Sequence, residues 1–233
     1  MILIIDTCGA EGGVALVQVE ADRGTFVQET AIAGRTFASE LVPAISDLLD
    51  GAELKPAEME AVAVVSGPGS FTGVRIGVSA AKALAEANSI PLIAISRLEV
   101  LVRLSGFMGR VLAVFEAGRG EFYGGLYEDG KCLREMLMTL EQVEEAATEM
   151  STQVVVCEVR AETALAAFSP TRLPAPMPGD AISIVTERWQ GRRFEDVAGL
   201  DGNYLRRSDA EIFLKDGRGQ VAANGAGKSK NAR

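Results

Sequence analysis

The chain of 233 residues contains no histidine. Without an imidazole there is no His-ligated metal site, no Ser-His-Asp triad and no Cys-His dyad. Catalysis by this chain would have to use carboxylates, lysine, tyrosine or a borrowed metal. The absence therefore excludes several common enzyme classes, metallopeptidases among them.

Cysteine and long apolar runs are also scarce. The chain has three cysteines, Cys8, Cys132 and Cys157, which lie far apart in the sequence and do not have the spacing of a zinc ribbon. An odd number of scattered cysteines is typical of reduced thiols in a cytoplasm. No uncharged apolar run reaches about 18 residues, so no membrane span is expected. The opening residues 1–6 have the pattern of a first strand rather than of a signal peptide. We therefore expect a cytoplasmic protein without a membrane partner.

Positive charge is in deficit, with a net charge of −9 at pH 7. Residues from Lys215 on hold five basic side chains and one acidic side chain, so the remainder is more acidic still. An acidic surface repels a phosphate backbone, which argues against independent RNA binding. Residues 214–233 are rich in Gly, Ala, Asn and Lys and predict a disordered basic tail, for which a weak RNA contact stays open.

Apolar periodicity predicts the same unit twice: a three-strand meander followed by alternating helices and buried strands. In the first copy we expect strands at 2–5, 12–19, 25–32, 61–65 and 91–95, and helices at 38–49 and from 73 to about 88. In the second we expect strands at 111–115, 120–127, 131–138 and 154–157, an Asp129-Gly130 hairpin turn, and helices at 140–150, 161–168 and 180–190.

Two such units resemble the two ribonuclease-H-like halves of the actin, Hsp70 and sugar-kinase superfold. We therefore predict an α/β protein of actin-like fold. The expected division is an N-terminal subdomain at 1–105, a C-terminal subdomain at 106–213 and the tail at 214–233.

The segment Ser66–Gly77 follows a buried strand and leads into a helix, which is how anion-binding loops are built. Its glycines are spaced G-x-G-x-x-x-G, Pro68 removes one backbone N–H, and no Gly-Lys-Ser/Thr follows. Asp6 and Thr7, at the end of the first strand, occupy the position of this superfold's first phosphate turn. The phosphate-loop-like candidates are Asp6, Thr7, Gly67, Gly69, Ser70, Thr72 and Gly73.

Several of these positions allow two interpretations. Either Ser70 or Thr72 can cap the helix. Arg75 opposes the helix dipole in the first turn, and either pairs with an acid of its own chain or is offered to a partner or anion. Glu116, Arg119 and Glu121 form the corresponding turn of the second half, where they either line a cleft or form a solvated hairpin corner.

These residues, with Pro91–Ser96, Arg119–Tyr123 and Tyr204-Leu205-Arg206, resemble the bacterial TsaB family, also called YeaZ. The resemblance covers roughly residues 1–130, and Gly67–Gly77 is close to a family hallmark. It implies a non-catalytic scaffold subunit of the machinery that forms N6-threonylcarbamoyladenosine at position 37 of ANN-decoding tRNAs. At the start of the first helix, Phe37–Glu40 replaces the family's usual polar opening.

The resemblance also implies partners. A catalytic paralogue, TsaD, would form a heterodimer with this chain through its first two helices, and a TsaE-like ATPase would join them. The chain alone would form a homodimer, and tRNA would be bound only through the complex. ATP and metal would be used by the partner subunits, with no intrinsic cofactor here beyond weak nucleotide binding. The expected partner-binding residues are Leu41, Ile45, Leu48, Arg75, Val78, Ala81, Lys82 and Ala85.

The alternative function is an autonomous Mg-dependent nucleotide phosphohydrolase or kinase that uses Asp6 and acids of the cleft. A peptidase, an older label for this superfamily, is disfavoured by the missing histidines. ATP turnover by the purified chain separates the alternative from a scaffold.

Overall fold

The computed structural model describes residues 1–20, 23–149 and 151–206. The predicted tail at 214–233 lies outside the described residues. No helix in the described ranges is long and apolar enough to cross a membrane.

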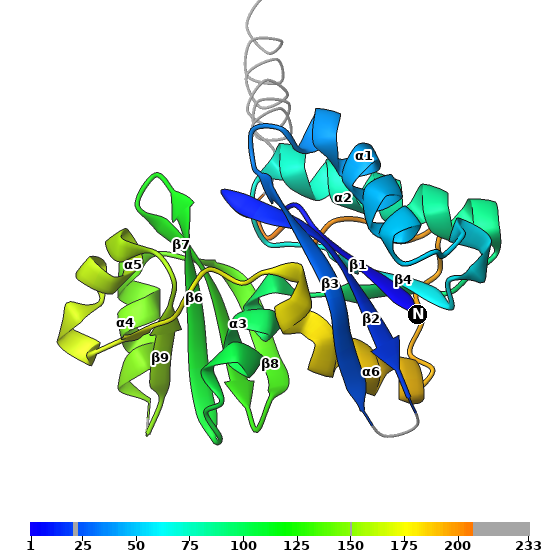
Figure 1. Cartoon of the computed structure of the whole chain (residues 1–233). Helices are drawn as coiled ribbons and strands as arrows, with labels where there is room; N and C mark the ends of the chain where they lie inside the picture. Colours follow the sequence, from blue (N-terminus) through cyan, green and yellow to red (C-terminus); the bar gives the residue numbers. More distant parts are fainter. Residues whose placement is uncertain (21–22, 150, 207–233) are drawn as a thin grey trace, which may run out of the picture.

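Two five-stranded mixed sheets form the framework (Figure 1). The first has the order β3-β2-β1-β4-β5 and the second the order β10-β9-β6-β7-β8, which is the same arrangement repeated. The first contains β1 (Ile2–Asp6), β2 (Glu11–Val19), β3 (Gly24–Ala33), β4 (Ala61–Val65) and β5 (Leu92–Ile95). The second contains β6 (Arg110–Gly118), β7 (Glu121–Glu128), β8 (Lys131–Met138), β9 (Gln153–Val156) and β10 (Thr171–Arg172). The internal repeat predicted from the sequence is confirmed.

Local chemistry explains why the strands were predictable. β1 and β4 are wholly apolar apart from Asp6 because they pair in parallel at the centre of the sheet, covered on both faces. The two-residue turn between β7 and β8 has φ of 47° at Asp129 and 74° at Gly130, which matches the twist of a hairpin.

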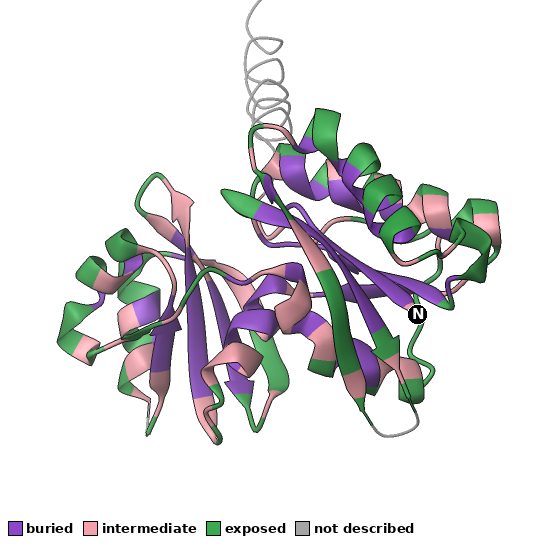
Figure 2. Cartoon of the chain, viewed as in Figure 1, coloured by how far each residue is buried: buried purple, intermediate pink, exposed green. Residues whose placement is uncertain are grey.

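Helices cover both faces of each sheet, and Figure 2 shows the buried residues of the strands between them. α1 (Phe37–Gly51) and α2 (Phe71–Asn88) lie side by side on one face of the first sheet. α4 (Leu140–Thr148) and α5 (Val159–Ala164) pack on the corresponding face of the second. The remaining helices are α3 (Arg97–Ser105), α6 (Ile182–Gln190) and the 3₁₀ turns η1 (Pro56–Glu58), η2 (Ala166–Phe168) and η3 (Pro178–Ala181).

The inner faces of the sheets are covered by exchanged helices. α3 follows the first sheet in sequence, yet its Leu98, Leu101 and Val102 join the core of the second sheet. α6 follows the second sheet, yet its Ile184 and Val185 join the core of the first. The sequence did not predict α3, and the expected ranges 1–105 and 106–213 do not correspond to separate cores.

A segment that we name the strap (residues 191–206) also returns to the first sheet. The Glu195 N–H donates to the Leu92 carbonyl at 2.8 Å, and the Asn203 N–H to the Ser66 carbonyl at 2.6 Å. Val197, Leu200 and Tyr204 pack against the first core. The strap therefore ties α2 and the end of β4 to the last part of the described chain.

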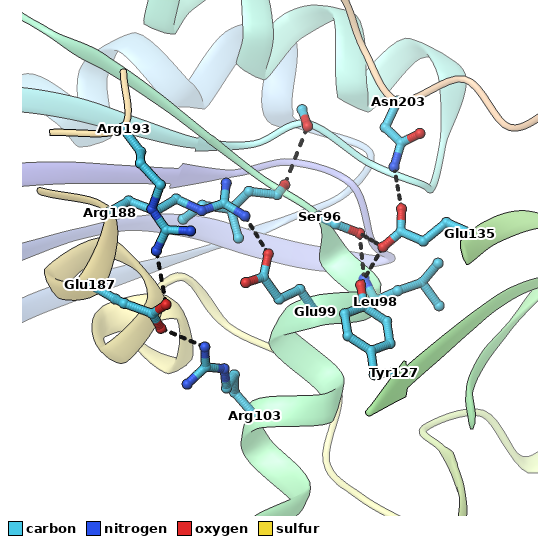
Figure 3. A network of polar contacts seen from close by, with 12 residues as sticks. Ser96, Leu98, Glu99, Arg103, Tyr127, Glu135, Glu187, Arg188, Arg193 and Asn203 are labelled. Atoms are coloured by element: carbon cyan, nitrogen blue, oxygen red, sulfur yellow. Dashed lines mark hydrogen bonds and ion pairs between the residues drawn. The ribbon is translucent and has the colours of Figure 1, made fainter. Parts of the chain in front are cut away.

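Polar contacts join the two halves around Glu135 (Figure 3). Its carboxylate accepts hydrogen bonds from the hydroxyls of Ser96 and Tyr127, and from the Asn203 side-chain amide at 2.7 Å. The three donors belong to the first half, the second sheet and the strap. One acidic side chain thus connects all three parts, and charge-assisted hydrogen bonds of this kind are the strong ones.

The helix exchange makes a testable prediction about Ile184, which is 1% exposed. Ile184→Ala should lower the free energy of unfolding by about 2–5 kcal/mol, because it leaves a cavity under the first sheet. Ser183→Ala, an exposed neighbour on the same helix, is the matched control and should change it by less than about 0.5 kcal/mol. Urea unfolding measures both, and equal small effects would contradict the packing of α6 on the first sheet.

Candidate functional site

The glycine segment packs directly on the turn that follows β1. The Thr7 hydroxyl donates to the Gly73 carbonyl at 2.7 Å. A Cβ at Gly73 would lie 2.0 Å from the Thr7 carbonyl oxygen, and one at Gly77 would lie 2.3 Å from Thr7 Oγ1. A Cβ at Gly69 would lie 2.3 Å from the Cys8 carbonyl oxygen. These glycines are therefore required by close backbone contact within the chain.

Two backbone groups of the glycine segment make hydrogen bonds within the chain. The Ser70 N–H donates to the Cys8 carbonyl at 2.8 Å, and the Gly67 carbonyl accepts the Arg97 N–H at 2.7 Å. Ser70, not Thr72, is the N-cap of α2, because its hydroxyl accepts the Gly73 N–H at 3.4 Å while Thr72 is exposed. The loop is therefore tied to the turn after β1 and to the start of α3.

Asp6 lies beneath this loop and is 1% exposed. Its Oδ1 accepts the Cys8 N–H at 2.8 Å. Burial raises the pKa of the Asp6 carboxyl, and the nearby positive charge of Arg97 lowers it in part. Among the described residues no group of three or more Cys, Asp or Glu side chains is arranged to hold a metal ion. Asp6 is therefore a buried acid whose carboxylate is bonded within its own turn.

A cleft of about 820 Å³ separates the two halves next to this loop. The first half contributes the turn around Gly9, the loop at Gly69 and the side chain of Arg97. The second half contributes β6, including Phe115 and Glu116. Of the three turn residues left open by the sequence, Glu116 lines the cleft.

The other two turn residues differ from Glu116. Glu121 pairs with Arg206 of the strap at 2.5 Å, and Arg206 also donates to the Gly118 carbonyl at 3.0 Å. Arg119 adopts a φ of 59° between Gly118 and Gly120, at the tight corner between β6 and β7. Glu121 therefore anchors the strap.

Most of the expected partner-binding residues prove to be core residues, which corrects that expectation. They are buried on the faces of α1 and α2 that pack on the first sheet, where the apolar stripe of an amphipathic helix belongs. The six, each less than 7% exposed, are Leu41, Ile45, Leu48, Val78, Ala81 and Ala85.

The remaining two reach the surface beside the strap. Lys82 Nζ donates to the carbonyls of Leu200 at 2.8 Å and Ala198 at 3.1 Å, so it holds the strap against α2. The Arg75 guanidinium lies over the Phe71 ring, 3.9 Å from its centroid, and has no ion pair among the described residues. Arg75 is therefore not paired with any acid of the described residues.

Sequence reasoning missed Arg97, the first residue of α3, which lines the cleft and is 6% exposed. Its guanidinium lies over the Phe115 ring at 4.4 Å, and a Cβ at Gly9 would lie 2.5 Å from Arg97 Nη2. The only local signal was Ser96, whose hydroxyl caps α3 by accepting the Leu98 N–H at 3.2 Å.

Two ribonuclease-H-like halves around a cleft define an α/β protein of actin-like fold. The family model of TsaD, tRNA N6-adenosine threonylcarbamoyltransferase, matches residues 26–212. The structure of YeaZ from Pseudomonas aeruginosa superposes with a TM-score of 0.70 at 26% identity, over 87% of this chain and 99% of that chain.

Among curated relatives, tRNA threonylcarbamoyladenosine biosynthesis protein TsaB of Bacillus subtilis (strain 168) is 36% identical over 128 residues, 54% of this chain and 55% of that protein. TsaB of Escherichia coli (strain K12) is 34% identical over 131 residues, 54% of each. The chain therefore spans about half the length of these relatives. It belongs to the TsaD family of sequences and, within it, to the TsaB (YeaZ) family.

The loop packing predicts opposite effects of alanine at two helix glycines. Gly73→Ala should cost about 3 kcal/mol of unfolding free energy or more, because its Cβ overlaps backbone. Gly51→Ala, at the end of α1, meets only the Gln28 side chain at 3.6 Å and should be neutral or stabilise by up to about 1 kcal/mol. Thermal or urea unfolding measures both; a tolerated Gly73→Ala would contradict this packing.

Burial of Asp6 predicts a pH dependence. Because its folded pKa is raised above 3.8, the folded state holds the proton more tightly than the unfolded state. Asp6 therefore makes the wild type lose stability as pH rises above 3.8. Asp6→Asn cannot titrate, so it should gain stability relative to the wild type over that rise. Urea titrations of both proteins at several pH values measure this, and parallel profiles would contradict it.

Proposed function

We propose that this chain is a non-catalytic scaffold and activator subunit in the formation of N6-threonylcarbamoyladenosine on tRNA. Membership of the TsaB family and the names of its curated relatives support the pathway. The observation that carries the non-catalytic role is the packing of the glycine segment on the turn after β1, where the Thr7 and Cys8 backbone leaves no room for a Cβ at Gly73 or Gly69 and the Cys8 carbonyl accepts the Ser70 N–H. The chain is proposed to use no cofactor of its own, ATP and metal being used by partner subunits.

We place the partner surface on the outward faces of α1 and α2, which lie side by side (Figure 1). Val42 on α1 is 70% exposed, although valine is an apolar residue usually found buried. On α2 the exposed residues Ser79, Ala83 and Ala87 are small. Small side chains let a second pair of helices approach closely, so this face suits a helical partner.

The proposed partner is a catalytic TsaD-like paralogue with the same fold, and a TsaE-like ATPase would join that heterodimer. In the absence of the paralogue the same face would pair two copies of this chain. The acidic composition fits binding of tRNA through the complex rather than by this chain alone.

Val42→Glu tests the surface. A carboxylate buried in an apolar helix contact is costly, so the substitution should weaken association with the cognate TsaD-like paralogue at least about tenfold. Val159→Glu is the matched control, because Val159 is 60% exposed on α5 of the second half and should leave association unchanged. Isothermal titration or size-exclusion chromatography measures both, and equal binding by the two variants would refute this surface.

Reconstitution tests the function itself. Modification of tRNA should require the paralogue and this chain together, while the purified chain alone should not turn over ATP. Full modification by the paralogue without this chain, or ATP turnover abolished by Asp6→Asn, would favour an autonomous phosphohydrolase or kinase instead.

A further inference from the structure

The cleft between the halves contains a buried cation that has no ion pair among the described residues. Arg97 is 94% buried, its Nε has no hydrogen-bond partner among the described residues, and no carboxylate of those residues lies within ion-pair distance of it. An unpaired buried charge is costly, so proteins pair such groups or neutralise them. Arginine cannot take the second course, because it keeps its proton in proteins.

Acidic side chains lie nearby, but each is engaged elsewhere. Asp6 accepts the Cys8 N–H, and Glu158 accepts the Glu116 N–H at 3.1 Å. The Glu116 carboxylate pairs with Arg160 at 2.7 Å. Among the described residues, none of these carboxylates therefore supplies an acceptor to the Arg97 Nε–H.

The Arg97 guanidinium is held in place from several directions. Its backbone N–H donates to the Gly67 carbonyl at 2.7 Å, at the first residue of a capped helix. The Phe115 ring lies against the guanidinium face, and Gly9 approaches Nη2 so closely that a Cβ would not fit. With a face and one end covered, the planar fork is preorganised for an acceptor that lies in its plane.

We propose that Arg97 is the anchor of a binding site for a small oxyanion, a carboxylate or a phosphate, in the cleft between the two halves. The space is large enough for a small molecule, since the cleft holds about 820 Å³. Recognition is by the Arg97 side chain rather than by the glycine loop, whose Ser70 N–H already donates to the Cys8 carbonyl. The site is separate from the outward faces of α1 and α2, so it does not rest on the proposed function.

Titration of the purified full-length chain tests the site. Sodium phosphate and sodium malonate, each at constant ionic strength against sodium chloride, are added while thermal unfolding and binding heat are followed. At least one of the two should raise the unfolding temperature of the wild type above the chloride control. The anion that does so distinguishes a phosphate ligand from a carboxylate ligand.

Variants connect the effect to Arg97. Arg97→Met should weaken binding of the active anion at least about tenfold, because it removes a charge-assisted bidentate contact. Arg97→Lys retains the charge but not the planar guanidinium, so it should also weaken binding of the anion. This variant replaces the methionine variant in the test if the latter does not fold. Arg192→Met is the matched control, because Arg192 is an exposed arginine that lines a different pocket, and it should bind as the wild type does. A wild type that responds to neither anion, or an Arg97 variant with undiminished binding, would overturn the proposal.

Discussion

The close approach of α2 to the turn after β1 is the constraint on which the rest of this structure depends. Thr7 hydrogen-bonds Gly73 across 66 positions of sequence, and three glycines leave out the Cβ atoms that would separate the two segments. The contact fixes where α2 begins and holds β1, β4 and α2 in one unit. The spacing of these glycines thus follows from packing within the chain.

The second organising feature is the exchange of α3 and α6 between the sheets. α3 comes from the first half and packs on the second sheet, while α6 comes from the second half and packs on the first sheet. The apolar burial that stabilises each sheet therefore also holds the two halves together. Glu135 adds hydrogen bonds from three separate segments at the same junction. Arg97 reaches the cleft because α3 starts at this junction.

The sequence predicted the fold class and most strands and helices, since these follow from local apolar periodicity and turn chemistry, as at Asp129-Gly130. It did not predict α3, because the apolar residues of this helix pack on the second sheet, whose strands come later in the sequence. It also did not predict that α6 and the strap pack on the first sheet. The apolar stripes on α1 and α2 were assigned to a partner because periodicity does not tell which surface a stripe meets. Arg97 was missed because no local pattern distinguishes a buried arginine from an exposed one.

The position of α6 has a consequence for synthesis of the protein. A chain emerges from the ribosome with its N-terminus first, and domains that are contiguous in sequence can fold as they emerge. Here the core of the first sheet includes Ala181, Ile184 and Val185, which are translated after every strand of the second sheet. The first core is therefore completed only after most of the second half has been translated.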